Sequence, residues 1–157
     1  MRVILLTGLV VFGGAELAEA QGRGGGGNAG PPIPAYRTSV MQGFQLHVGA
    51  IRTIVAGTAG APSHLVGHAE AIRHLTVMAA DVFPAGSGGA GTRATEAIWS
   101  NSSEFAARLA ALQSAGEGLA KAAASGNNDE VNAALTTLNQ ACQACHMAFR
   151  GPPPAAN

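Results

Sequence analysis

The chain has 157 residues, with nine basic and nine acidic side chains, so its formal net charge at pH 7 is zero. That length is enough for one domain with a modest core. The balanced charge offers no electrostatic basis for binding nucleic acid or an anionic membrane surface.

The first 20 residues have the pattern of a secretory signal peptide. Arg2 precedes an apolar run from Val3 to Phe12, and a small-x-small cleavage pattern follows at residues 18–20. We predict cleavage before Gln21 and export to the periplasm. The apolar run is shorter than the roughly 20 residues that span a membrane, so stable membrane insertion is not expected. The processed chain keeps eight basic and seven acidic residues, a net charge of +1.

The rest of the chain divides into a leader, a helical domain and a tail. Residues 21–34 are rich in glycine and proline, which predicts a flexible leader. From residue 35, apolar residues recur at spacings of three and four in four segments, which is typical of amphipathic helices. No segment alternates with a period of two over the length of a strand. We predict an all-α fold, an antiparallel four-helix bundle over residues 35–151, and a tail over residues 152–157.

Polar residues mark where three of the helices begin. Ser63 is the expected N-cap of the second helix. A long loop without regular structure should follow that helix. Asn101 and Glu104 have the spacing of a capping box at the start of the third helix, and Asn127 and Glu130 open the fourth.

The fourth helix has the clearest register. Its apolar positions step by four, three, four, three and four residues: Val131, Leu135, Leu138, Cys142, Cys145 and Phe149. Both cysteines should therefore face the core, less than one turn apart. The inner faces of the bundle otherwise carry many alanines and glycines, and such small side chains pack a core poorly. This predicts a large apolar ligand between the helices.

Cys142, Cys145 and His146 form a Cys-x-x-Cys-His motif, for which three chemistries compete. A structural zinc site needs four ligands, which this motif does not supply, and nothing ties His64 and His68 to it. A redox dithiol belongs at a helix N-terminus, where the dipole lowers the thiol pKa, whereas this motif lies at the C-terminal end of a helix, where the dipole has the opposite effect. Covalent haem fits, because two thiols form thioethers with the vinyl groups and the histidine binds the iron. The motif predicts one haem c.

Four stretches resemble those of the class II c-type cytochromes, the cytochrome c′ and cytochrome c-556 group: YRTSVM, DVFPAGSG, AIWSNSSEF and CQACHMAFR. The similarity covers residues 35–151. It implies the same four-helix bundle, with Cys142 and Cys145 as the thioether attachment points and His146 as the proximal iron ligand.

The resemblance also implies roles around the haem. Arg37 would lie near a propionate, unless it is an ordinary solvated arginine, and Thr38 departs from the glutamine common in relatives. Arg150 would lie beside the proximal face, where it also complements the helix dipole. Trp99 would pack over the haem edge or against the third helix. The remaining histidines are expected to be solvated or locally hydrogen-bonded: His47, His64, His68 and His74.

Met41 bears most directly on mechanism. It shares a helix face with Arg37, Phe44 and Val48. The resemblance implies two roles, since a methionine here binds iron as the sixth ligand in cytochrome c-556 relatives, whereas a bulky residue only covers the distal face in cytochrome c′ relatives. Methionine on an apolar face is also common core filler. The sequence leaves these roles open.

The function implied first is one-electron transfer with redox partner proteins, which needs no enzyme activity. The alternative is a five-coordinate haem that binds nitric oxide or carbon monoxide, with Met41 and Phe44 crowding the distal face. A haem-bearing subunit of a larger redox complex is a third option. Apolar residues such as Ile54 and Leu65 would allow a homodimer through the first two helices.

Overall fold

A computed structural model of the chain describes residues 32–89 and 91–153. The predicted signal peptide, residues 21–31 of the leader and residues 154–157 of the tail lie outside the described residues. The helices are α1 (Ile33–Val55), the 3-10 turn η1 (Pro62–His64), α2 (Leu65–Asp81), α3 (Ala97–Ser100), α4 (Ser102–Ser125) and α5 (Asn128–Phe149). Among the described residues, none of these helices is both long and apolar enough to cross a membrane.

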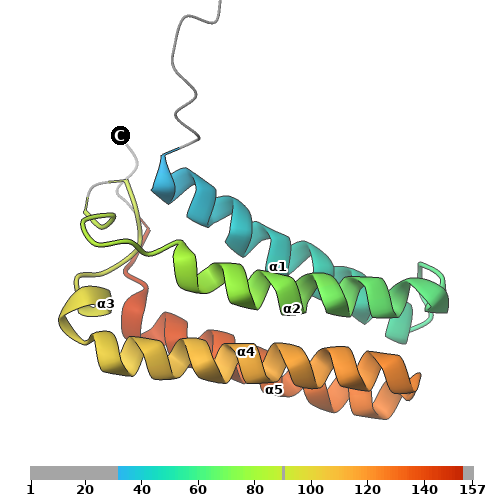
Figure 1. Ribbon diagram of the computed structural model, residues 1–157. Helices are drawn as coiled ribbons and strands as arrows, with labels where there is room; N and C mark the ends of the chain where they lie inside the picture. The colour runs from blue at the N-terminus through green and yellow to red at the C-terminus, as the bar shows by residue number, and fades with distance from the viewer. Residues whose placement is uncertain (1–31, 90, 154–157) are drawn as a thin grey trace, which may run out of the picture.

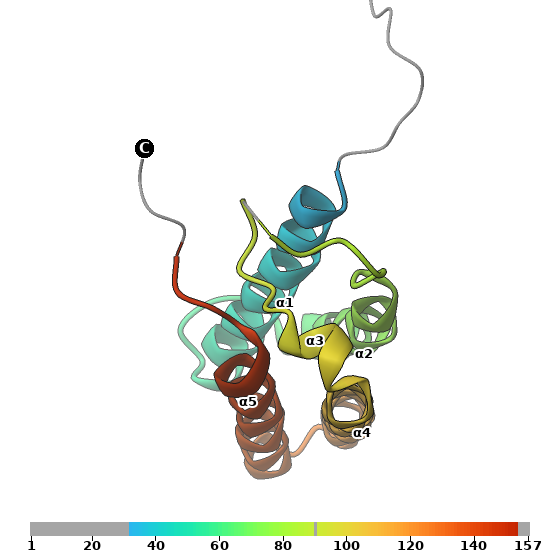
Figure 2. The same cartoon turned by 90° about the vertical axis from the view of Figure 1, so that its left-hand side faces the viewer.

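The four long helices form the predicted all-α bundle, which confirms the expected fold class. Along the chain, α1 packs against α2, α2 against α4, and α4 against α5 (Figure 1). Figure 2 shows the bundle end-on, with these helices at its four corners. The fourth side differs, because α1 and α5 make few contacts with each other.

Two helix starts differ from the expected ones. α1 begins at Ile33, inside the predicted leader, because Pro34 suits a first helical turn, where its fixed φ and missing N–H cost nothing. Ser63 is not an N-cap, since it lies within η1, and α2 begins at Leu65 without a side-chain capping bond.

The segment before α4 also departs from expectation. The loop was expected to lack regular structure, but it contains α3. Asn101 stands at the N-cap of α4, but its side chain makes no hydrogen bond to the helix backbone. Its Nδ2 instead donates to Glu104 Oε2 at 2.8 Å, so the predicted capping box is wrong. The start of α5 is confirmed, because Asn127 Oδ1 accepts hydrogen bonds from two backbone N–H groups of the first turn.

The core combines a few large aliphatic side chains with many alanines. The largest fully buried side chains are Ile51, Ile72, Thr76, Val82, Leu119, Val131 and Leu138. Ile54 and Leu65, expected at a dimer surface, are only 9% and 5% exposed and belong to this core. The surface expectation was wrong for both, because the amphipathic pattern did not reveal how wide a stripe α1 and α2 each bury. A homodimer through α1 and α2 would have to use their exposed large apolar residues: Ile33, Tyr36, Leu46, Val66, Val77 and Met78.

Gly116 and Gly118 of α4 give a matched test of the packing between α4 and α2. A Cβ at Gly116 would lie 2.8 Å from Thr76 Cγ2, whereas a Cβ at Gly118 meets nothing within 4 Å. Gly118→Ala should raise the free energy of unfolding by about 0.5–1 kcal/mol through helix propensity. Gly116→Ala should lose that gain and fall below wild type, because Thr76 must move. Urea unfolding of both haem-loaded variants checks this, and equal gains would contradict the packing.

Candidate functional site

A cavity of about 700 Å³ lies where α1 and α5 stay apart. Its lining also includes residues from α2, the loop after it, α3 and α4. It brings together all of the predicted site residues except Trp99: Arg37, Met41, Phe44, Cys142, Cys145, His146 and Arg150. Its size falls in the range of ligand pockets, about 300–1,000 Å³.

The α5 side of the cavity carries the ligating groups. Cys142 and Cys145 are free thiols and half-buried, and burial raises the pKa of both. Partial burial lowers the pKa of His146, and the charges of Arg150 and Arg93 lower it further. A neutral imidazole keeps a nitrogen lone pair for a metal ion. The arrangement therefore offers two thiols and one metal ligand on the same wall.

An apolar stripe runs along the α1 side of the cavity. Met41, Phe44 and Val48 lie about one turn apart along the helix, and all three belong to or pack against the main core. Four other α1 residues that line the cavity are polar and exposed: Thr38, Gln42, Gln45 and Arg52. A ligand held against the stripe would meet hydrocarbon and thioether groups.

Three phenylalanines close one end of the cavity. Phe105 makes edge-to-face contacts with Phe83 and Phe149, with ring centroids 5.0 Å and 5.1 Å apart. Such pairs prefer this geometry and hold each other's orientation. Phe149, expected in the core, therefore also shapes the site together with Phe83.

Arg37 is not the solvated arginine that remained an alternative, because only 6% of it is exposed. Its Nε donates to Val82 O at 2.9 Å, one terminal nitrogen donates to Thr92 Oγ1 at 3.0 Å, and both terminal nitrogens donate to Ser87. Its guanidinium also stacks 4.5 Å from the centre of the Phe83 ring. All five N–H donors already have protein acceptors, so Arg37 holds the loop against α1.

A second set of bonds ties the loop to the end of α5. Arg93 Nε donates to Gly151 O at 2.8 Å, and Gly151 N–H donates to Arg93 O at 2.7 Å. The backbone N–H of Thr95 donates to Phe149 O at 3.1 Å. Arg93 thereby lines the cavity. Nothing in the sequence indicated this role, because the partner of Arg93 in the hydrogen bond, Gly151, lies 58 positions further along the chain.

Trp99 and the other histidines lie elsewhere. Trp99 does not line the cavity, and its indole N–H donates to Phe83 O at 3.2 Å. Its side chain packs against the cluster of Ile98, Phe105 and Phe149, and Phe105 belongs to α4, the third of the expected helices. None of the other four histidines lines the cavity, and two of them are hydrogen-bonded to each other, as expected for local pairing.

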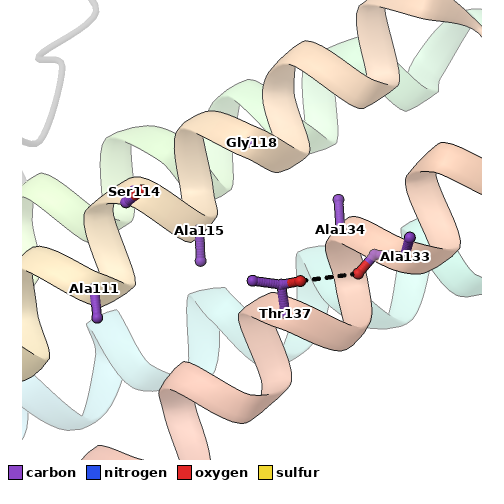
Figure 3. A pocket seen from close by; sticks show the side chains of 7 residues that line it. All are labelled: Ala111, Ser114, Ala115, Gly118, Ala133, Ala134 and Thr137. Carbon is purple, nitrogen blue, oxygen red and sulfur yellow. Dashed lines mark hydrogen bonds between the residues drawn. The ribbon is translucent and has the colours of Figure 1, made fainter.

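A second concavity between α4 and α5 has a different character (Figure 3). Its lining consists of small residues: Ala111, Ser114, Ala115, Gly118, Ala133, Ala134 and Thr137. The Thr137 hydroxyl donates to the Ala133 carbonyl of its own helix at 3.2 Å. No ionisable or metal-ligating side chain lines this concavity, so the chemistry lies in the cavity between α1 and α5.

Known proteins are similar to this chain in sequence and in fold. The model of the cytochrome C' family matches residues 33–150. Over 116 residues the chain is 33% identical to the cytochrome c′ of Pararhodospirillum photometricum, covering 73% of this chain and 93% of that protein. Over 116 residues it is 32% identical to the cytochrome c′ of Rhodospirillum rubrum, covering 73% and 79%.

Solved structures agree. The nitric oxide complex of a cytochrome c prime variant from Alcaligenes xylosoxidans has a TM-score of 0.70 and 27% identity over 76% of this chain and 94% of its own. A carbon monoxide-bound variant of the same protein gives the same values of 0.70, 27%, 76% and 94%.

A four-helix bundle with Cys-x-x-Cys-His on the wall of an apolar cavity defines a c-type haem protein. The chain belongs to the cytochrome c′ family, and its cofactor is covalently attached haem c. The residues fit that group, because two thiols three positions apart, an adjacent imidazole and a large apolar cavity occur together.

Arg37 provides a test of how the cavity wall is held. Arg37→Lys keeps the positive charge but loses the planar fork that reaches Val82, Ser87 and Thr92 together. We expect the free energy of unfolding to fall by at least about 2 kcal/mol, because buried acceptors lose their donors. Arg73→Lys on α2 is the control, since its pair with Glu70 is half-exposed and worth little. Urea unfolding measures both, and equal small effects would contradict the role of Arg37.

Proposed function

We propose that this chain binds a small diatomic gas, nitric oxide or carbon monoxide, at a haem whose open face is turned toward α1. The apolar stripe of Met41, Phe44 and Val48 on the α1 wall of the cavity is the observation that carries the proposal. In this arrangement Cys142 and Cys145 would hold the haem, and His146 would bind its iron. The iron supplies the gas-binding and one-electron chemistry when haem is present.

The two thiols that would be attached to haem line the α5 wall. Each thiol would add across a vinyl group, forming a sulfur–carbon bond, while the thiol hydrogen would pass to the neighbouring vinyl carbon. The raised pKa values of Cys142 and Cys145 are consistent with thiols that stay protonated until they react. The signal-peptide pattern supports attachment in the periplasm, after export.

The apolar stripe of α1 would select among gases by the groups it lacks. Met41, Phe44 and Val48 carry no N–H or O–H donor for a bound ligand. A gas molecule that faces only this stripe would have no hydrogen-bond donor, which disfavours dioxygen more than nitric oxide or carbon monoxide. The nitric oxide and carbon monoxide complexes of variants of the Alcaligenes xylosoxidans protein support the binding of these two gases.

Positive charge near the cavity suits the two carboxylates of haem. Arg52, Arg93 and Arg150 all line the cavity, and none of them forms an ion pair with the described acidic residues. The N–H donors of Arg37 already have protein acceptors, so a hydrogen bond from Arg37 to a propionate would require one of these bonds to break. We therefore assign propionate binding to these three arginines ahead of Arg37.

Electron transfer with Met41 as the sixth iron ligand is the second candidate. It was the function implied first by the sequence, and it is the arrangement of the cytochrome c-556 group. The observation that favours it is that Met41 lines the cavity and is packed partly against the core. A fixed thioether there would raise the reduction potential and close the iron to gases.

Met41→Ala separates the two candidates. If the α1 wall only crowds the iron, the wild-type ferric spectrum is high-spin, carbon monoxide shifts the ferrous spectrum, and the variant binds carbon monoxide roughly tenfold more tightly because crowding is relieved. Absorbance titration with carbon monoxide measures this.

Met78→Ala is the matched control for this substitution, because Met78 lies on the exposed face of α2, outside the cavity. It should leave both spectra and the carbon monoxide affinity unchanged. A low-spin wild type with a sulfur-to-iron charge-transfer band that Met41→Ala abolishes would reject gas binding in favour of electron transfer.

A further inference from the structure

A pair of histidines lies outside the haem cavity, where α1 packs against α2. The Nδ1 atoms of His47 and His68 are 2.9 Å apart. The ring centroids are 5.2 Å apart, and the ring planes are inclined by 53°. Both side chains are half-buried, so solvent reaches the pair. Two imidazole nitrogens from different helices thus meet at one accessible point.

The contact between the two rings requires a free lone pair on one of them. A hydrogen bond between two Nδ1 atoms needs one N–H and one lone pair, which two neutral imidazoles can supply. Burial lowers the pKa of His47, and the neighbouring His68 lowers it further, so the neutral ring is favoured. Neutral imidazole is the ligating form. When both Nδ1 atoms bind an ion, the donor ring moves its proton to Nε2 through water and stays neutral.

The spacing suits two neighbouring positions around one ion. With metal–nitrogen distances of about 2.0 Å, a separation of 2.9 Å corresponds to an angle of about 90° at the metal. That is the angle between adjacent ligands of square-planar or tetragonal Cu²⁺, whereas tetrahedral Zn²⁺ needs the nitrogens further apart. Rotation about the broad χ2 torsions turns both lone pairs toward a common point.

The geometry points to a second metal site, in which His47 and His68 bind a divalent transition-metal ion, Cu²⁺ most tightly, and water completes the coordination. Imidazole suits Cu²⁺, Ni²⁺ and Zn²⁺, and Cu²⁺ stands highest in the affinity order for such ligands. The described residues contain no cluster of three or more His, Cys, Asp or Glu suited to a metal ion. The site is therefore open and exchangeable, and its ion would bridge α1 and α2.

Titration of the haem-loaded, tag-free protein with Cu²⁺ against a competing chelator tests the site. His47→Ala and His68→Ala should each weaken Cu²⁺ binding by at least about tenfold. Electron paramagnetic resonance of the wild-type complex should show coupling to two imidazole nitrogens. Because the ion joins two helices, Cu²⁺ should raise the Tm of the wild type and of neither variant.

His64→Ala is the matched control, because His64 precedes His68 by one turn and the two could otherwise chelate an ion along one helix. This variant should bind Cu²⁺ as the wild type does. The proposal is overturned if His47→Ala keeps wild-type affinity, or if His64→Ala loses as much affinity as His68→Ala. The haem absorbance spectrum checks folding, and His47→Gln and His68→Gln replace any alanine variant that alters it.

Discussion

The structure depends on one constraint, which is that α1 and α5 stay apart while the other neighbouring helices pack closely. Their separation creates a cavity of about 700 Å³ in a domain whose core is rich in alanine. Hydrocarbon walls around so large a space need a partner of similar size, because protein interiors are otherwise close-packed. Haem c satisfies that need, and its covalent attachment to α5 makes the cofactor part of the core.

The walls of the cavity are held in place by hydrogen bonds to the loop between α2 and α3. Arg37 fastens the loop after α2 to α1, and Arg93 fastens the same loop to the end of α5. One loop thus ties both walls of the site together, although the two helices scarcely touch. The loop, and not direct contact with α5, therefore sets the position of the α1 wall across the cavity.

The features that were predictable from the sequence are encoded within a few residues, although the local caps expected at Ser63 and Asn101 were wrong. The seam of α5 and the Asn127 cap are local, and the Cys-x-x-Cys-His motif joins a chemical requirement to helical spacing. Features that depend on distant partners were not. Contacts made by the loop account for three of them: the burial of Arg37, the position of Arg93 and the hydrogen bond from Trp99 to the Phe83 carbonyl. α3 was missed because four residues give no periodicity to detect.

The central claim is that haem is bonded to α5 through both of its thiols. Mass spectrometry of peptides from the exported, mature protein tests this most directly. The account predicts that the peptide spanning residues 142–146 carries the mass of one haem and that neither Cys142 nor Cys145 reacts with a thiol reagent. A peptide of unmodified mass with two reactive thiols would contradict it.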